Sequence, residues 1–204
     1  MHIELLGLSG VRIQGDNTTI LLSPPSKKSE LKSSRMKADI VVLGNMGDEI
    51  NVDPANEQLF IIDQPGEFES SGVFFYCVGH PPKGETNSLL TSLTVEGVTI
   101  THLSGLSGEL DASAIDLFEG TDVLMIPTGG KDVLDAKQAS KLVNAIEPRV
   151  VIPMHFAKQG LKTNYDAPDA FLKELGAKTE KQDKARLTKK DLPQDTMQTI
   201  YLAS

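Results

Sequence analysis

The sequence has little cysteine and little positive charge. A single cysteine, Cys77, stands among 204 residues. One cysteine excludes any disulfide within the chain, which fits a reducing compartment. The formal net charge is −8 and the sequence pI is about 5.0. We expect no nucleic-acid partner, because a phosphate backbone is bound by a basic face.

Segments that address a chain to a membrane or to export are also missing. The N-terminal stretch MHIELLGLSGVRIQG has no basic region followed by an apolar one, so it does not read as a signal peptide. No apolar run approaches the roughly 20 residues that a membrane-spanning helix needs. These features predict a cytoplasmic protein without a membrane partner.

Several common catalytic motifs are absent. The run Gly129-Gly130-Lys131 lacks the first glycine and the hydroxyl residue of a phosphate-binding loop. The run Gly105-Leu106-Ser107-Gly108 is one residue short of a serine-nucleophile elbow. Cys77 lies inside the apolar run 74–78, where a cysteine is typically a small buried hydrophobe. None of these sequences indicates a catalytic residue.

Short β-strands dominate the first half of the chain, and helices alternate with strands in the second. Apolar runs broken by glycine, asparagine or proline predict a meander at 1–22 and further strands at 38–44, 59–63, 72–78 and 88–103, with a loop at 45–58. Gly97 marks a hairpin turn, and the polar run 23–37 reads as an exposed loop. Helical spacing predicts helices at 111–118, 135–148 and 168–177, with strands at 121–127 and 149–156. We expect one domain, residues 1–204.

Four of these segments carry a family resemblance. IDQPGEFESSGV (62–73), VLMIPTGG (123–130), DAKQASKLVNAIEP (135–148) and RVVIPMHF (149–156) follow one another in this order. Together they resemble the metallo-β-lactamase superfamily, in particular its metal-dependent hydrolase branch, to which L-ascorbate-6-phosphate lactonase is related. The resemblance implies an α/β fold, the αββα four-layer sandwich, with two mixed β-sheets, outer helices and a cleft at one edge.

The resemblance also implies a dinuclear zinc or manganese site, but the ligand motif is degenerate. The family's Thr-His-x-His-x-Asp-His run would follow the strand ADIVVL, where the ligand positions become Asn45, Gly47, Glu49 and Ile50. The family's bridging aspartate becomes Gly105, and an early Asp-Pro becomes Ser23-Pro24. All three histidines of the first motif are therefore missing.

Two histidines remain as weak candidates for a metal. The resemblance places His155 at the family's final ligand, and His80 at another metal-binding histidine. His102 matches a framework position. Asp48 and Glu49 are carboxylates that can assist, yet a catalytic zinc site needs three protein ligands. We therefore predict no cofactor, and we take Asn45, Asp48, Glu49, His80, Gly105 and His155 as the cleft remnant of the family site, with no catalytic residue assigned.

Three functions remain open, so the sequence leaves enzymatic activity undecided. The first is a catalytically degenerate member that acts by binding or scaffolding, with an unknown small molecule, a protein, or a second copy in a homo-oligomer as its partner. The second is a metal-dependent hydrolase with a reduced, mononuclear zinc or manganese site formed by His155, His80 and an acid. The third is a metal-free hydrolase that uses the same cleft. The residue types at the ligand positions favour the first.

Overall fold

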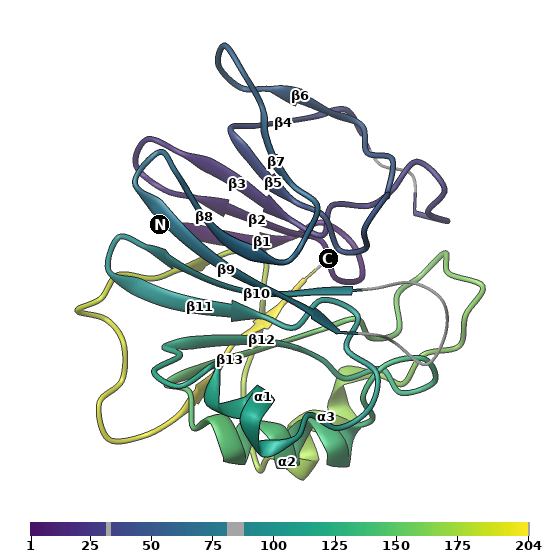
Figure 1. Cartoon of the computed structure of the whole chain (residues 1–204). Coiled ribbons are helices and arrows are strands. Elements are labelled where there is room, and N and C mark those ends of the chain that lie inside the picture. Colours follow the sequence, from purple (N-terminus) through teal and green to yellow (C-terminus); the bar gives the residue numbers. More distant parts are fainter. Residues whose placement is uncertain (32–33, 81–87, 204) are drawn as a thin grey trace.

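The computed structural model describes residues 1–31, 34–80 and 88–203, and two β-sheets packed face to face form its centre (Figure 1). The first sheet has the strand order β15-β1-β2-β3-β5-β7. Its strands are β1 (His2–Leu5), β2 (Val11–Gln14), β3 (Thr19–Leu22), β5 (Ile40–Val42), β7 (Phe60–Ile62) and β15 (Ala185–Arg186). Strands β1 to β3 form the antiparallel meander expected from the sequence, and β3, β5 and β7 are parallel.

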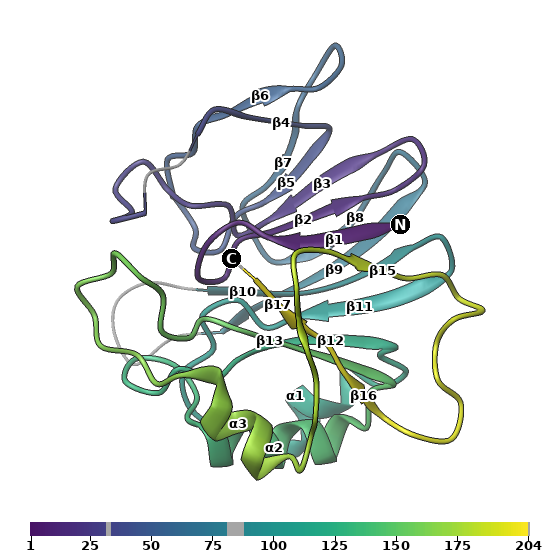
Figure 2. The same ribbon diagram turned by 180° about the vertical axis from the view of Figure 1, so that it is seen from behind.

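The second sheet has the order β16-β13-β12-β11-β10-β9-β8. Its strands are β8 (Gly66–Ser70), β9 (Val73–His80), β10 (Ser88–Val95), β11 (Val98–His102), β12 (Val123–Pro127), β13 (Val150–Met154) and β16 (Gln198–Thr199). The turn between β10 and β11 places Glu96 and Gly97 at positive φ, as a tight hairpin requires. Seen from behind, the C-terminal strands run beside β1 and β13, and β14 (Lys181–Gln182) pairs with β17 (Tyr201–Leu202) (Figure 2).

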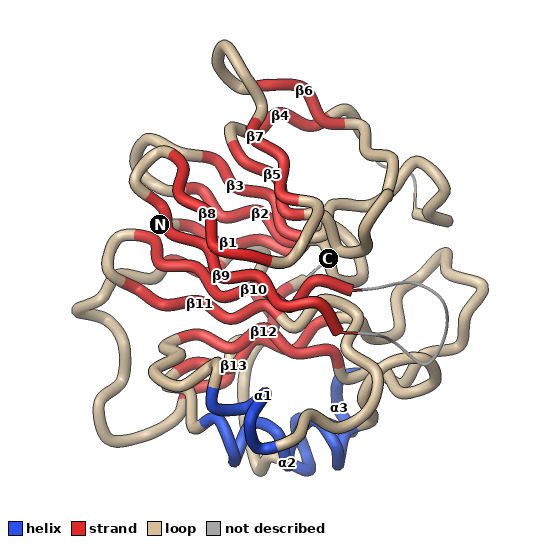
Figure 3. Tube along the Cα trace, in the orientation of Figure 1, coloured by secondary structure: helices blue, strands red, loops and turns tan. Residues whose placement is uncertain are grey.

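The helices gather on the outer face of the second sheet (Figure 3). They are α1 (Ala112–Asp116), α2 (Ala136–Ile146) and α3 (Pro168–Glu174). Asp135 caps α2 and forms a capping box with Gln138, and the helix ends at Glu147 in a left-handed conformation just before Pro148. Leu142 and Val143 bury the apolar stripe of α2 against Leu124 and Val151 of the sheet.

A small pair of strands covers the outer face of the first sheet instead. Strand β4 (Met36–Ala38) pairs with β6 (Val52–Pro54), and Met36 and Ala38 pack on Leu21 and Val41. The sequence prediction treated residues 23–37 and 45–58 as loops, and for residues 36–37 and 52–54 that prediction was wrong. Each strand has only three residues, Met-Lys-Ala and Val-Asp-Pro, so neither carries a pattern that distinguishes it from the polar segments around it.

The main core lies between the two sheets. Inward side chains of both sheets are fully buried there, among them Ile13, Ile20, Phe75 and Ile152. Cys77 belongs to this core, and burial raises the pKa of its thiol to about 11, which confirms it as a small buried hydrophobe. The sandwich of two mixed sheets is therefore confirmed.

The sheet topology brings the carboxyl ends of several strands to one edge. In each sheet the parallel strands point the same way, so the loops after β3, β5, β11 and β13 leave at that edge. Ligands of open α/β sheets bind outside the carboxyl ends of strands. The fold therefore concentrates the loops that hold the predicted site residues.

Candidate functional site: a serine-lined cleft at the strand ends

The loops at this edge enclose a cleft of about 250 Å³. It is lined by residues from five loops, which are Leu8, Ser9, Gly10, Ser23, Pro24, Pro25, Ser26, Ser29, Leu31, Gly44, Asn45, Asp48, Ser104, Gly105 and His155. A larger hollow of about 590 Å³ lies between the end of α2 and the segment 193–197, and none of its described lining residues is a histidine. Of these two pockets, the smaller cleft contains described residues of the predicted site and the larger hollow does not.

Left-handed backbone conformations turn three of these loops away from their strands. Ser23, Ser104 and His155 have φ values of 45°, 33° and 52°, each within two residues of a strand end. Such conformations are unfavourable for residues with a side chain and cluster at functional sites. Gly44 permits the close approach of the loops, because a β-carbon there would lie 2.8 Å from Ser23 Oγ. The cleft wall is thus built at some expense in backbone strain.

His155 forms a short hydrogen bond with Ser9 at this wall. Its Nδ1 lies 2.6 Å from Ser9 Oγ, and Tyr165 packs edge-on against the ring at 4.9 Å between centroids. Burial lowers the pKa of His155 to about 4, and the charge of Asp132 opposes that shift, so the ring is neutral at pH 7. Its Nε2 is buried and has no hydrogen-bond partner among the described residues.

His102 contacts the backbone of Ser9 and has both ring nitrogens bonded. Its Nε2 donates to the carbonyl oxygen of Ser9 at 2.8 Å, and its Nδ1 accepts from the backbone N–H of Ser104 at 3.3 Å. The side chain is fully buried, and this burial lowers the pKa of His102 to about 4. His102 therefore ties the loop after β1 to the loop after β11, as a framework residue would.

Asn45 and Asp48 form the opposite part of the cleft. The Asn45 amide donates to the Asp48 carboxylate at 3.3 Å and accepts from Ser88 Oγ at 3.2 Å. Asn45 also forms an isolated β-bridge with Ser88, which fixes the loop after β5 to the start of β10. The carboxylate is half-buried. Asp48 and His155 thus line one cleft from different sheets.

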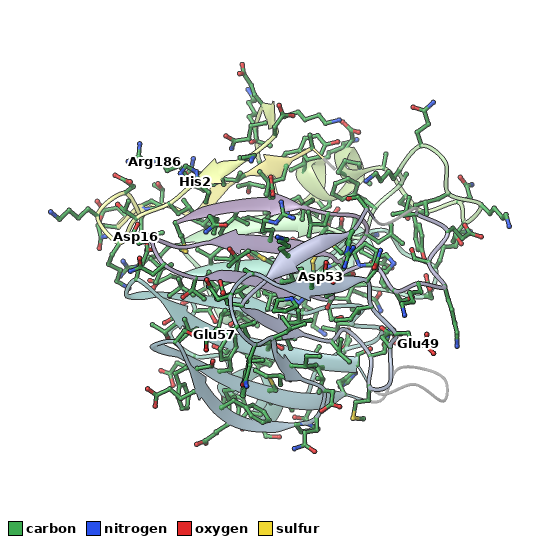
Figure 4. All side chains as sticks on the ribbon, turned by 90° about the horizontal axis from the view of Figure 1, so that it is seen from above. His2, Asp16, Glu49, Asp53, Glu57 and Arg186 are labelled. Atoms are coloured by element: carbon green, nitrogen blue, oxygen red, sulfur yellow. The ribbon has the colours of Figure 1, made fainter. Side chains whose placement is uncertain are left out.

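Two of the predicted site residues lie elsewhere. Glu49 points outward and pairs with Lys27 at 3.8 Å, and the view from above shows it at the periphery, far from His2 and Arg186, which lie side by side (Figure 4). His80 is the last residue of β9 and pairs across the strands with Ser88, on the side away from Asn45. Neither residue lines the cleft.

The side chains present do not fit a dinuclear metal centre. Gly105, where the resemblance predicts the family's bridging aspartate, has open space where a side chain would begin, since no described atom lies within 4 Å of its would-be β-carbon. Ile50 packs with the small apolar cluster around Met36. Among residues 1–31, 34–80 and 88–203, no three His, Cys, Asp or Glu side chains form a group able to hold a metal ion.

A family model described as a β-lactamase superfamily domain matches residues 2–155. The chain belongs to the β-lactamase superfamily. The match includes the strand-end loops and ends on His155. The resemblance to the metallo-β-lactamase superfamily is therefore confirmed, and the chain is a member whose relatives carry the name of metal-dependent hydrolases.

Curated relatives share parts of this chain. A UPF0173 protein of Pyrococcus furiosus is 41% identical over 54 residues, which are 26% of this chain and 24% of that protein. A UPF0173 metal-dependent hydrolase of Thermococcus kodakarensis is 27% identical over 126 residues, which are 60% of this chain and 50% of that protein. The matched segments thus span half or less of these relatives.

Solved structures share the fold over the whole length. A metallo-β-lactamase superfamily protein from Thermotoga maritima superposes with a TM-score of 0.83 at 23% identity, covering 98% of this chain and 97% of that one. The metallo-β-lactamase fold protein YhfI of Bacillus subtilis gives 0.62 at 11% identity, covering 99% and 95%. Among the described residues, no helix is long and apolar enough to cross a membrane.

Sequence reasoning missed Ser9. It lies in the loop after β1, where the run Leu8-Ser9-Gly10 reads as ordinary hairpin punctuation. The signal available was its place at the end of a strand, since that edge also holds His155. Contacts with two histidines from another sheet are long-range, and no local pattern predicts them.

Proposed function

We propose that this chain is a catalytically degenerate member of its family, and that it binds a small polar ligand in the cleft without a dinuclear metal centre. The small number of metal-ligating side chains in the cleft supports this most strongly. Of the positions that carry ligands in the family, His155 keeps its ligand type, and Asp48 is the one carboxylate among the described residues that line the cleft. A catalytic zinc site needs three protein ligands and an open position.

The cleft itself remains well formed. Ser9, Ser104 and Ser23 connect its walls by hydrogen bonds, with Ser9 Oγ donating to Ser104 O at 3.0 Å and the hydroxyls of Ser23 and Ser104 3.0 Å apart. Such a polar, partly enclosed site is suited to small-molecule binding. A site that keeps its strained loops and loses its ligands supports binding rather than metal-assisted hydrolysis.

Metal loading tests this proposal. The purified chain is incubated with excess Zn²⁺ or Mn²⁺, passed through a desalting column and analysed for bound metal. We expect far less than one tightly held ion per chain, and an unchanged melting temperature after chelator treatment. One or two retained ions per chain, or a melting temperature lowered by several degrees on chelation, would contradict the proposal.

Metal-free hydrolysis is a second candidate, and one contact favours it. A serine hydroxyl 2.6 Å from a histidine nitrogen is the arrangement of an activated nucleophile. However, burial makes His155 a weak base, and no described carboxylate bonds its Nε2 to orient it. Covalent labelling decides this case. A serine-directed phosphonylating reagent that modifies Ser9 in the parent, and not in His155→Ala, would favour the hydrolase.

A further inference from the structure

We propose that the cleft takes a neutral polyhydroxylated small molecule of about monosaccharide size, recognised as a hydrogen-bond donor and acceptor rather than by charge. This inference rests on the proposed binding function and names the ligand class. It is carried by three features of the cleft, which are the hydrogen-bond direction at His155, the charges of the lining side chains, and the free serine hydroxyls.

The direction of hydrogen bonding at His155 follows from Ser9. The Ser9 hydroxyl has one hydrogen and two neighbours, the Ser104 carbonyl oxygen at 3.0 Å and His155 Nδ1 at 2.6 Å. A carbonyl oxygen only accepts, so the Ser9 hydrogen satisfies it, and Nδ1–H of His155 donates to Ser9 Oγ. The other ring nitrogen, Nε2, then carries a lone pair.

That lone pair needs a donor. Nε2 of His155 is the buried side-chain atom without a hydrogen-bond partner in the described part of the chain. A buried acceptor left unpaired is unfavourable, and native structures usually supply a partner from protein, water or ligand. A ligand with hydroxyl groups can donate to it, directly or through a water molecule, whereas a fully ionised phosphate group has no hydrogen to give.

The charges of the lining point the same way. Asp48 is the sole acidic side chain among the described lining residues, and no Lys or Arg occurs among them. An anionic ligand would meet the Asp48 carboxylate with no lining cation to offset it, because phosphate and carboxylate are bound by Arg, Lys or clustered backbone N–H groups. The cleft therefore disfavours an anion.

The serine hydroxyls of the cleft favour a polyol over a cation as the ligand. Ser29 Oγ accepts from the backbone N–H of Leu31 at 3.2 Å, and its own hydrogen has no acceptor among the described residues. Ser26 likewise has no side-chain hydrogen bond within that part of the chain. A hydroxyl of the ligand can accept from one serine and donate to Asp48 or His155, whereas an ammonium group only donates. A cleft of about 250 Å³ suits a ligand of this size.

A matched set of probes tests the class. Binding to the metal-free chain is measured by calorimetry and saturation-transfer NMR for glucose, ribose and myo-inositol, for glucosamine and glucose 6-phosphate, and for fully O-methylated glucose. We expect at least one neutral polyol to bind, glucose 6-phosphate to bind at least about tenfold more weakly, and the O-methylated sugar, which keeps acceptors but has no donors, to lose binding.

Variants assign the effect to the cleft. Asp48→Asn is expected to reduce the discrimination against glucose 6-phosphate, and the matched change Glu49→Gln, one residue along the same loop but outside the cleft, to leave it unchanged. Ser9→Ala removes the hydroxyl that accepts from Nδ1–H of His155. The ring is then expected to populate both neutral tautomers, which its ¹⁵N shifts report, and polyol binding is expected to weaken about tenfold.

Each contrary result overturns the inference. Tighter binding of the phosphate ester would make the cleft an anion site, tighter binding of glucosamine a cation site, and equal binding of the O-methylated sugar would remove the donor requirement. No neutral polyol binding more tightly than about 50 mM would also refute it. Retention of metal in the loading experiment would instead refute the proposed function, so the two failures are distinguishable.

Discussion

His102 and His155 contact the same residue, Ser9, one at its backbone carbonyl and the other at its hydroxyl, and their surroundings differ. At the buried junction His102 has both nitrogens bonded, to the Ser9 carbonyl and the Ser104 N–H. At the cleft wall His155 bonds Ser9 Oγ with one nitrogen and leaves the other unpaired. Burial lowers the pKa of both. The junction is complete by itself, whereas the cleft wall has capacity for a ligand.

The difference between the two histidines shows that the loops around the cleft can be held in place by contacts that do not take part in ligand binding. The loops after β3, β5, β11 and β13 still meet, held by hydrogen bonds and by the close approach at Gly44. At the positions where the resemblance predicts metal ligands, the chain carries Asn45, Gly47 and Gly105. The scaffold survives because its stability comes from packed sheets and hydrogen bonds.

Truncating each of the two histidines to alanine should give the largest difference in the free energy of unfolding. His102→Ala leaves the Ser9 carbonyl and Ser104 N–H unpaired and opens a cavity, which we expect to lower the free energy of unfolding by about 3–4 kcal/mol. His155→Ala removes one hydrogen bond and should lower it by at most about 1–2 kcal/mol. Urea unfolding measures both. A larger loss for His155→Ala would show that the cleft wall, and not the junction, holds the loops together.

Acid should weaken the fold through the same two residues. Both histidines have a folded-state pKa of about 4, below the ordinary value of 6.5. Between these values the unfolded chain binds protons that the folded chain does not, so stability falls as the pH is lowered from about 6.5 towards 4. The slope is up to about 1.4 kcal/mol per pH unit for each histidine.

The variant His155→Asn isolates one of the two contributions to this slope. Asparagine can still donate to Ser9 Oγ but does not titrate, so the slope between about pH 6.5 and 5 should fall by roughly half. Denaturant unfolding at a series of pH values measures it. An unchanged slope would mean that the pKa of His155 is the same in the folded and the unfolded chain, and the comparison of two neutral histidines would fail.

The smallest effect is expected at Glu49. Glu49→Gln removes a pair with Lys27 in which both side chains are exposed, so the free energy of unfolding should change by less than about 0.5 kcal/mol. Thermal and urea unfolding check this. A loss above about 1 kcal/mol would place Glu49 within the structure of the cleft and contradict its outward position.

The sequence predicted the layers of the fold better than the composition of the site. Alternating apolar runs gave the buried strands, and the stripe of α2 gave the packed helix, because both follow local periodicity. The pair β4–β6 was missed, since each strand is short and its partner lies more than a dozen residues away. Short strands in polar segments carry little periodic signal.

At the site, the resemblance placed His155, Asn45, Asp48 and Gly105 among the residues that line one cleft. It also suggested Glu49 and His80, which the structure puts elsewhere, because side-chain direction in an irregular loop and the end of β9 depend on tertiary contacts. Ser9 could not be found from local pattern, since its partners are 93 and 146 residues away along the chain. Its role stays a prediction for experiment.

We expect His155 to be a neutral hydrogen-bond acceptor that is held by Ser9 and binds no metal. Long-range ¹H–¹⁵N NMR of the histidine rings, recorded at neutral pH with and without excess Zn²⁺, tests it most directly. We predict opposite tautomers for the two buried rings, Nε2–H for His102 and Nδ1–H for His155, with the His155 nitrogens unshifted by zinc. A His155 ring in the Nε2–H form, or an Nε2 resonance that moves to a metal-bound position on adding zinc, would contradict the account.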